Sequence, residues 1–288
     1  MAGEPMEYDD FSAYCRFSPV ALAVREAVRL AAVRHLDLAE PILDVGCGDG
    51  LFAGLAYPHR QVWGIDINPV EIKRAQATAS YSTLICGNVS HVALPRGFFG
   101  SAVANCSLEH VPDLPEALAN IGRSLRPGAA FALIVPTPEW SRHLALAELL
   151  GRVGLHRAAT AYGNALDRVF RHIHLQDDRW WSDRLREAGF DAINIRTIVS
   201  RATSWIFEMF LPPSAMGWAV KKLTGRWIVA PVLRGPSTEL SWKVIEQLYR
   251  VLPDGDSRSA SEYLIVARAT GRASGHSIGE GESLPRES

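Results

Sequence analysis

The sequence of 288 residues has little of several features that mark specialised protein classes. Its formal net charge is only −1, from 30 Lys and Arg against 31 Asp and Glu, so no global basic field is available to hold DNA or RNA. The four cysteines form no CxxC pair and have no zinc-finger spacing, which excludes a disulfide scaffold and a zinc finger. We therefore expect no nucleic-acid partner and no metal.

Long apolar runs are also missing. The N-terminal MAGEPMEYDDF has neither the basic nor the apolar region of a signal peptide. No segment reaches the roughly 18 apolar residues of a membrane-spanning helix, and the nearest, 205–220, contains Glu208, Pro212 and Pro213. What is present is a globular composition, with 48% hydrophobic and 21% charged residues. These observations favour a cytoplasmic protein.

Short apolar runs alternate with helical patterns along most of the chain, which predicts an α/β fold. Helices are expected at 18–36, 113–125 and 177–188, and the connection 137–176 is also expected to be helical. In the first of these helices, Ser18 is the expected N-cap and Pro19 the first helical residue. The expected architecture is a doubly wound, mostly parallel seven-stranded sheet with a helical insertion before the last strand. The strands are predicted at 41–45, 61–65, 83–86, 101–104, 130–135, 192–199 and 261–267.

A glycine-rich turn follows the first predicted strand, in the sequence Gly46-Cys47-Gly48-Asp49-Gly50. Glycine lets backbone N–H groups and a helix N-terminus approach a ligand closely. The third glycine of a dinucleotide fingerprint is replaced by Leu51, which disfavours NAD. Asp66 ends the second strand, 20 residues after Gly46, where an acid can accept hydrogen bonds from both hydroxyls of a ribose. The pattern predicts a ribose-bearing ligand.

Five sequence blocks follow one another along the chain: ILDVGCGDG (42–50), GIDINP (64–69), CGNV (86–89), SLEHVPD (107–113) and LRPG (125–128). Together, and in this order, they resemble the class I S-adenosylmethionine-dependent methyltransferases. LEHVPD is similar to the ubiquinone-biosynthesis O-methyltransferases and to many glycan and lipid methyltransferases. The resemblance covers about 40–136 and, more weakly, 170–200 and 260–268. It implies a Rossmann-like methyltransferase fold and S-adenosylmethionine as cofactor.

The same resemblance implies a set of cofactor-binding residues. Gly46 and Gly48 would pass close to the methionine part, Asp66 would bind the ribose, and Ile67 would pack on the adenine. Where the family often has Asp, Asn88 can still accept from the adenine amino group through its carbonyl oxygen. The full predicted set is Asp44, Gly46, Gly48, Asp66, Ile67, Asn88, Val89 and Asn105.

Methyl transfer is an in-line displacement from a sulfonium, and a hydroxyl acceptor benefits from a base. His110 follows the fourth strand and is the first candidate base; the alternative is that it caps or packs in this loop. His174 is the second candidate, against a solvated or helix-capping role, and in an extended segment His172 would face the same side. Glu109 either faces solvent or binds a divalent ion together with His110. Of these two alternatives, we expect that no metal is bound.

The predicted organisation has five parts: an N-terminal helical lid (1–39), a cofactor-binding core (40–202), an aromatic helical insertion over the acceptor (203–255), the last strand (256–270) and a disordered tail (271–288). The insertion, with Lys221-Lys222, favours a small-molecule acceptor that is hydrophobic, lipid-linked or a glycan, with peripheral membrane contact through 203–233. A buried lid and a dimer interface are the alternatives.

The predicted activity is therefore methyl transfer, with O-methylation favoured. Two other functions remain as alternatives. One is a catalytically inactive scaffold that binds S-adenosylmethionine, for which Asn88 is the only motivation. The other is a nicotinamide-dependent oxidoreductase, which Leu51 disfavours.

Overall fold

A computed structural model describes residues 6–78, 80–214, 217, 235–252 and 260–271. Seven strands form one sheet in the order β3-β2-β1-β4-β5-β7-β6. All neighbours are parallel except β7, which runs antiparallel to both β5 and β6. The strands are β1 (Ile42–Val45), β2 (Val62–Asp66), β3 (Thr83–Cys86), β4 (Phe99–Asn105), β5 (Leu125–Pro136), β6 (Phe190–Thr197) and β7 (Glu262–Ala269). The predicted mostly parallel, seven-stranded fold is confirmed.

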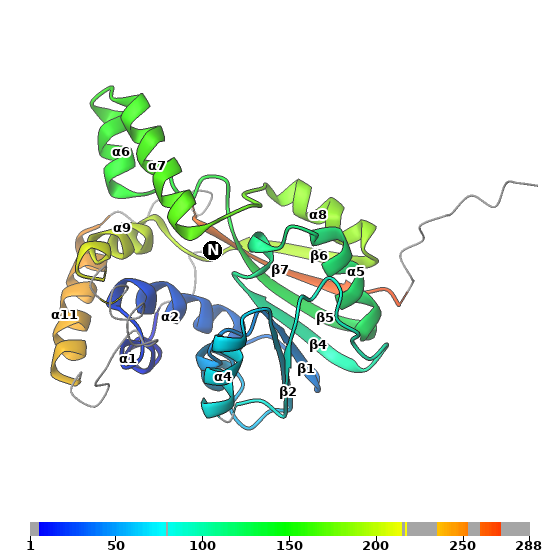
Figure 1. The fold of residues 1–288 in the computed structure, drawn as a ribbon. Coiled ribbons are helices and arrows are strands. Elements are labelled where there is room, and N and C mark those ends of the chain that lie inside the picture. The colour runs from blue at the N-terminus through cyan, green and yellow to red at the C-terminus, as the bar shows by residue number, and fades with distance from the viewer. Residues whose placement is uncertain (1–5, 79, 215–216, 218–234, 253–259, 272–288) are drawn as a thin grey trace, which may run out of the picture.

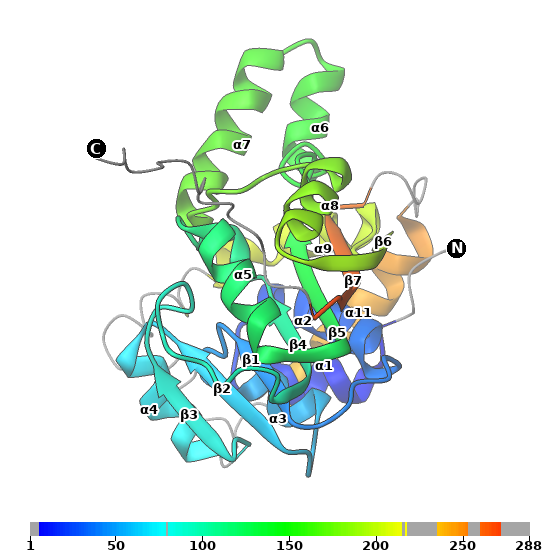
Figure 2. The same cartoon turned by 90° about the vertical axis from the view of Figure 1, so that its right-hand side faces the viewer.

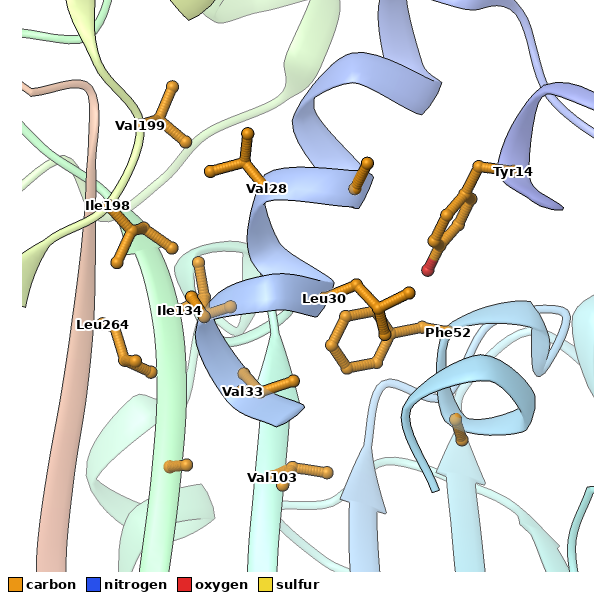
Figure 3. Packing of buried hydrophobic residues seen from close by; sticks show 14 of the residues in the cluster. Tyr14, Val28, Leu30, Val33, Phe52, Val103, Ile134, Ile198, Val199 and Leu264 are labelled. Carbon is orange, nitrogen blue, oxygen red and sulfur yellow. The ribbon is translucent and has the colours of Figure 1, made fainter. Parts of the chain in front are cut away.

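Helices cover both faces of this sheet (Figure 1). The helix α2 (Val20–Arg34) packs on one face, and α5 (Leu114–Ser124) and α8 (Asp178–Glu187) pack on the other. Along β5 the side chains alternate, because successive residues of a strand point to opposite faces: Ala130, Ala132 and Ile134 face α2, whereas Phe131, Leu133 and Val135 face α5 and α8. Figure 3 shows the α2 side of this core, where Val28, Leu30 and Val33 lie over Val103, Ile134 and Leu264.

The start of α2 differs from the expected one. The helix begins at Val20, and Pro19 takes the N-cap position in an extended conformation. The Ser18 hydroxyl donates instead to the Tyr14 carbonyl, 2.9 Å away, and so closes the turn after α1 (Tyr8–Cys15). Ser18 is therefore not the N-cap, because its hydroxyl serves the preceding helix. By contrast, Asp177 caps α8 by accepting from the Trp180 N–H at 2.8 Å.

The helices α9 (Arg201–Met209) and α11 (Gly235–Val251) lie between β6 and β7, which confirms a helical insertion before the last strand. On α11, Ile245 is buried, but Leu240, Val244 and Val251 are exposed. The helix packs on α1 and α9. Residues 218–234, with Lys221-Lys222, and 272–288 of the predicted tail lie outside the described residues.

Further helices are α3 (Leu51–Ala56), α4 (Pro69–Thr78), the 3₁₀ turn η1 (Leu108–His110), α6 (Ala145–Arg152) and α7 (His156–Phe170). The last two form an antiparallel pair that stands out from the body, as the two perpendicular views show (Figures 1 and 2). Within the described ranges, no helix is both long and apolar enough to cross a membrane.

Candidate cofactor and acceptor site

The carboxyl ends of β1, β2, β3 and β4 meet at one edge of the sheet because these strands are parallel neighbours. Two cavities that share Gly46 lie at this edge, here called the first lobe and the second lobe. Asp66, Ile67, Asn88, Val89 and His110 line the first lobe. Asp44, Gly48 and Asn105 line the second lobe, and Gly46 lines both. The structure thus brings together every predicted site residue except His174.

The turn after β1 requires glycine. Gly46, Gly48 and Gly50 have φ of +75°, +54° and +82°, a region that side chains with a Cβ rarely adopt. A Cβ on Gly46 would lie 2.3 Å from the Cβ of Ser107, whereas no atom lies within 4 Å of one on Gly48. Backbone therefore forms the floor of the cavity.

Asp66 holds this turn in place while it faces the first lobe. One carboxylate oxygen accepts from the Gly48 N–H at 2.9 Å, and the other accepts from the Asn68 N–H at 2.8 Å. Each oxygen keeps lone-pair capacity for a further donor, as the two hydroxyls of a ribose require. Beside it, Ile67 is 69% exposed and offers an uncovered apolar surface for an aromatic base. Asn88 accepts from the Ser90 N–H at 2.9 Å through the same amide oxygen that was assigned to the adenine.

The second lobe contains polar atoms without hydrogen-bonding partners in the described part of the chain. Asn105 donates through Nδ2 to Glu26 at 2.9 Å, but its buried Oδ1 has no partner, and neither has the buried Tyr14 hydroxyl. Buried unsatisfied oxygens favour a ligand that brings donors, such as the ammonium of a methionyl group. Asp44 is less available, because its Oδ2 accepts from the Tyr81 hydroxyl at 2.7 Å and burial raises its pKa to about 7.

The residues present therefore fit S-adenosylmethionine. A family model described as "Methyltransferase domain" matches residues 16–195, more than half of the chain. The chain belongs to this family of methyltransferase domains.

Several relatives are similar over part of the chain. An uncharacterised methyltransferase of Mycobacterium tuberculosis is 33% identical over 96 residues, covering 32% of this chain and 49% of its own. Nocamycin O-methyltransferase of Saccharothrix syringae is 38% identical over 135 residues, which cover 40% of this chain and 48% of that protein. The chain thus spans about half the length of these curated relatives. A solved S-adenosylmethionine-dependent methyltransferase of Thermotoga maritima superposes with a TM-score of 0.56 at 14% identity, covering 87% of this chain and 91% of that chain, which shows the fold.

A third cavity, here called the chamber, adjoins both lobes. It shares Cys106 and His110 with the first lobe and Leu22 and Glu26 with the second. The other residues that line the chamber are Arg25, Arg29, Glu109, Pro136, Phe170, His172 and Phe207. They come from α2, the end of β5, η1, the C-terminal end of α7 with the residues after it, and α9.

Two arginines of the chamber are already paired with carboxylates. Arg29 donates to fully buried Glu262 at 2.6 and 2.8 Å and to Glu26 at 2.6 Å, and Arg25 also pairs with Glu262. Burial alone would raise the pKa of Glu262, but the charges of Arg25 and Arg29 outweigh it and lower the pKa to about 2. The formal charges of this cluster cancel, so it offers little net attraction for an anion.

Three further titratable side chains, Glu109, His110 and His172, line the chamber. Burial raises the pKa of Glu109 to about 8, and its Oε2 has no hydrogen-bonding partner among the described residues. Burial lowers the pKa of His110, and it lowers that of His172 to about 3 with help from the neighbouring His110. The two imidazoles stack, with ring centroids 5.6 Å apart. All three side chains are thus favoured in their neutral forms near pH 7.

His174 does not line the chamber or either lobe. Its Nε2 lies 2.8 Å from the Val111 carbonyl, and its ring stacks on Trp180. The N–H groups of Ile173 and His174 both donate to the Glu109 carbonyl, and this curled backbone turns His172 and His174 to different surroundings. No group of three or more His, Cys, Asp or Glu in the described part of the chain is arranged to hold a metal ion.

Sequence reasoning missed the contribution of α2. Arg25, Glu26 and Arg29 are charged residues in a helix that otherwise consists mainly of Ala, Val and Leu. Lys, Arg, Asp and Glu are almost never fully buried unless they are paired. Charged residues within this apolar pattern were therefore an available signal for a polar cavity, whereas their partner Glu262, 233 residues after Arg29, was not identifiable from spacing.

Proposed function

We propose that the protein methylates a hydroxyl group of an uncharged, largely apolar small molecule that binds in the chamber. The observation that carries this proposal is the junction between the cavities, where Cys106 and His110 belong to the chamber and to the first lobe at once. An acceptor in the chamber is thereby adjacent to the cofactor. Phe170 and Phe207 supply aromatic walls, and the cancelled charges around Glu262 favour an uncharged ligand.

In this proposal His110 is the general base. Its Nδ1 lies 3.0 Å from the Arg171 carbonyl, which can only accept, so Nδ1 carries the proton. The lone pair is then on Nε2, which is on the side of Glu109, 3.7 Å from Oε1. Since burial lowers its pKa, His110 is in the neutral form that can take a proton from a hydroxyl at pH 7.

Glu109 would bind the acceptor rather than take its proton. With its pKa raised to about 8 by burial, the carboxyl is mostly protonated at pH 7 and can donate a hydrogen bond through the unpartnered Oε2. Such a donor would fix the acceptor oxygen beside His110 Nε2. His174 becomes a positioning residue in this scheme, because it holds the segment next to Glu109 through Val111.

When bound, S-adenosylmethionine would supply an electrophilic methyl group carried on a positively charged sulfur. The residues of this chain align the acceptor and remove its proton. The known activity of the Saccharothrix relative, an O-methyltransferase, supports oxygen as the acceptor atom. A lipid-linked or glycan acceptor remains a narrower hypothesis, and among these the aromatic walls favour the lipid-linked one.

The test is a screen of uncharged phenols, isoprenoid alcohols and hydroxylated polyketides for S-adenosylhomocysteine release, followed by kinetics of His110→Asn on the best acceptor. Loss of a general base should lower kcat about 10²- to 10⁴-fold, while calorimetry finds cofactor affinity within about threefold of wild type. His91→Asn is the matched control, because His91 lies on the surface with its side chain 64% exposed.

Two results would contradict the proposal. If His174→Asn abolishes turnover and His110→Asn does not, His174 rather than His110 is the general base. If the wild type binds S-adenosylmethionine tightly but methylates none of the hydroxyl acceptors, the inactive scaffold is favoured instead.

A further inference from the structure

The hairpin of α6 and α7 projects away from the sheet, and the turn at 153–155 is its outermost part (Figures 1 and 2). The C-terminal end of α7 lies against the body, where Phe170 packs on Trp140 and Phe207. At 1.5 Å per residue, the 15 residues of α7 place the turn about 20 Å from that contact. The hairpin therefore presents a convex end.

Apolar side chains are exposed on this convex end. Leu146, Leu149 and Val153 share one face of α6 and its continuation, with exposures of 41%, 57% and 61%, and Leu155 is 53% exposed. The exposed face of α8 is of the ordinary kind, with charged residues such as Asp183 and Arg186. A cluster of uncovered aliphatic residues at the end of a projection indicates an interaction surface.

The charges of the same end are of one sign. Between Leu149 and Leu166 the sequence has no Asp or Glu, while Arg152 and Arg157 are exposed. The nearest acid on α6, Glu148, is mostly buried and pairs with Arg201 and Arg152. Its charge is therefore already compensated, and the tip is cationic as well as apolar.

We propose that this hairpin tip, residues 149–157, binds the surface of a bilayer that is rich in anionic lipids. Leu149, Val153 and Leu155 would enter the boundary between headgroups and acyl chains, and Arg152 and Arg157 would meet lipid phosphates. The charge of the tip argues for this occupant, because exposed Arg152 and Arg157 flank the aliphatic residues and residues 150–165 include no Asp or Glu. This site differs from segment 203–233, most of which lies outside the described residues.

The interaction has a direct consequence for access to the chamber. Phe170, at the end of α7, and His172, just beyond it, line the chamber, so the hairpin connects the proposed membrane contact to the acceptor cavity. Docking would hold the chamber near molecules that dissolve in the bilayer. The membrane proposal itself does not rest on the acceptor, because vesicle binding is measured without methyl transfer.

The test is co-sedimentation of the full chain with vesicles of phosphatidylcholine alone or with 30% phosphatidylglycerol, in 0.1 M and 0.5 M NaCl. We expect binding to the anionic vesicles at low salt that weakens at high salt. The double variant Arg152→Glu/Arg157→Glu should bind at least about 25-fold more weakly, because each of the two cations near such a surface is worth roughly fivefold. The triple variant Leu149→Ser/Val153→Ser/Leu155→Ser should bind the anionic vesicles at least about tenfold more weakly than wild type.

The matched control is Arg179→Glu/Arg186→Glu, which makes the same charge change on the exposed face of α8. Cofactor binding and the thermal midpoint confirm that each variant is folded. The proposal is overturned if the wild type does not bind anionic vesicles, or if the control loses as much binding as the tip variants. It is also overturned if the wild type elutes as a dimer that the serine variant dissociates, because a second copy of the chain would then be the occupant.

Discussion

The most direct energetic consequence of the structure concerns Glu262, the fully buried carboxylate at the start of β7. It neutralises both Arg25 and Arg29, which are themselves almost completely buried. Glu262→Gln keeps the shape of the side chain but removes its charge, and so leaves two guanidinium groups in the interior with only Glu26 to compensate them. Removing one partner of a buried ion pair is strongly destabilising.

The magnitude follows from the pKa of Glu262, which falls from an ordinary 4.5 to about 2 because the two arginines outweigh the effect of burial. Each unit is about 1.4 kcal/mol, so the ionised form contributes about 3 kcal/mol to the free energy of unfolding at pH 7. For a protein of this size, such a loss lowers Tm by roughly 6–10 °C.

The sign of the pH dependence is fixed by the direction of the shift. Because the folded pKa lies below the unfolded one, the contribution is complete above pH 4.5 and is lost as the pH falls toward 2. Urea unfolding, followed by circular dichroism, should therefore show a gap of about 3 kcal/mol between wild type and Glu262→Gln at pH 7.5 and a smaller gap at pH 3.5.

Glu187→Gln is the control for the Glu262 prediction. It removes an exposed helical ion pair with Arg184, at 2.7 Å, which is worth at most about 0.5 kcal/mol. If Glu262→Gln is as stable as wild type at pH 7.5, or no less stable than Glu187→Gln, the buried cluster is not the stabilising element that its geometry indicates.

Three further predictions concern the site. Asp66→Ala should weaken S-adenosylmethionine binding by about 1–3 kcal/mol in calorimetric titration, whereas Asp183→Ala, on the exposed face of α8, should leave it unchanged. Gly46→Ala should abolish cofactor binding and lower Tm, because its Cβ would lie 2.3 Å from Ser107 at a φ of +75°; unchanged affinity would show that the turn can move. With increasing pH, kcat/KM should first rise as His110 loses its proton, with a midpoint below pH 6.5 because burial lowers the pKa of His110. It should then fall near pH 8 as Glu109 ionises. Glu109→Gln should remove the alkaline fall, and a fall that persists would exclude the neutral donor.

The sheet, and the meeting of the predicted cofactor-binding residues at one of its edges, were predictable because local patterns determine them. Apolar runs of strand length fixed the positions of the seven strands, and the glycine turn after β1 requires a backbone that only glycine adopts readily. Once the strands are parallel, Asp66, Asn88 and Asn105 must arrive at the same edge. Here the sequence order alone implies the spatial neighbourhood.

The chamber was not predictable, because its residues come from elements that are distant in the sequence. Arg29 and Glu262 are 233 residues apart, and the local sequence around either residue does not identify the other as its partner. His172 and His174 illustrate a second limit. An extended segment would place them on one side, but two hydrogen bonds to the Glu109 carbonyl curl the backbone, and only His172 reaches the chamber.

Two glutamates at the chamber have surroundings that favour opposite protonation states. Glu262 is held ionised by two arginines, whereas Glu109 is buried without a hydrogen-bonding partner for Oε2 and is mostly protonated at pH 7. Glu26, on the second lobe, pairs with Arg29 and accepts from Asn105. Carboxyl groups whose pKa values differ so widely typically have distinct roles in one site. The helix α2 carries Glu26 as well as both arginines, so a shift of α2 would alter the cofactor lobe and the acceptor chamber together.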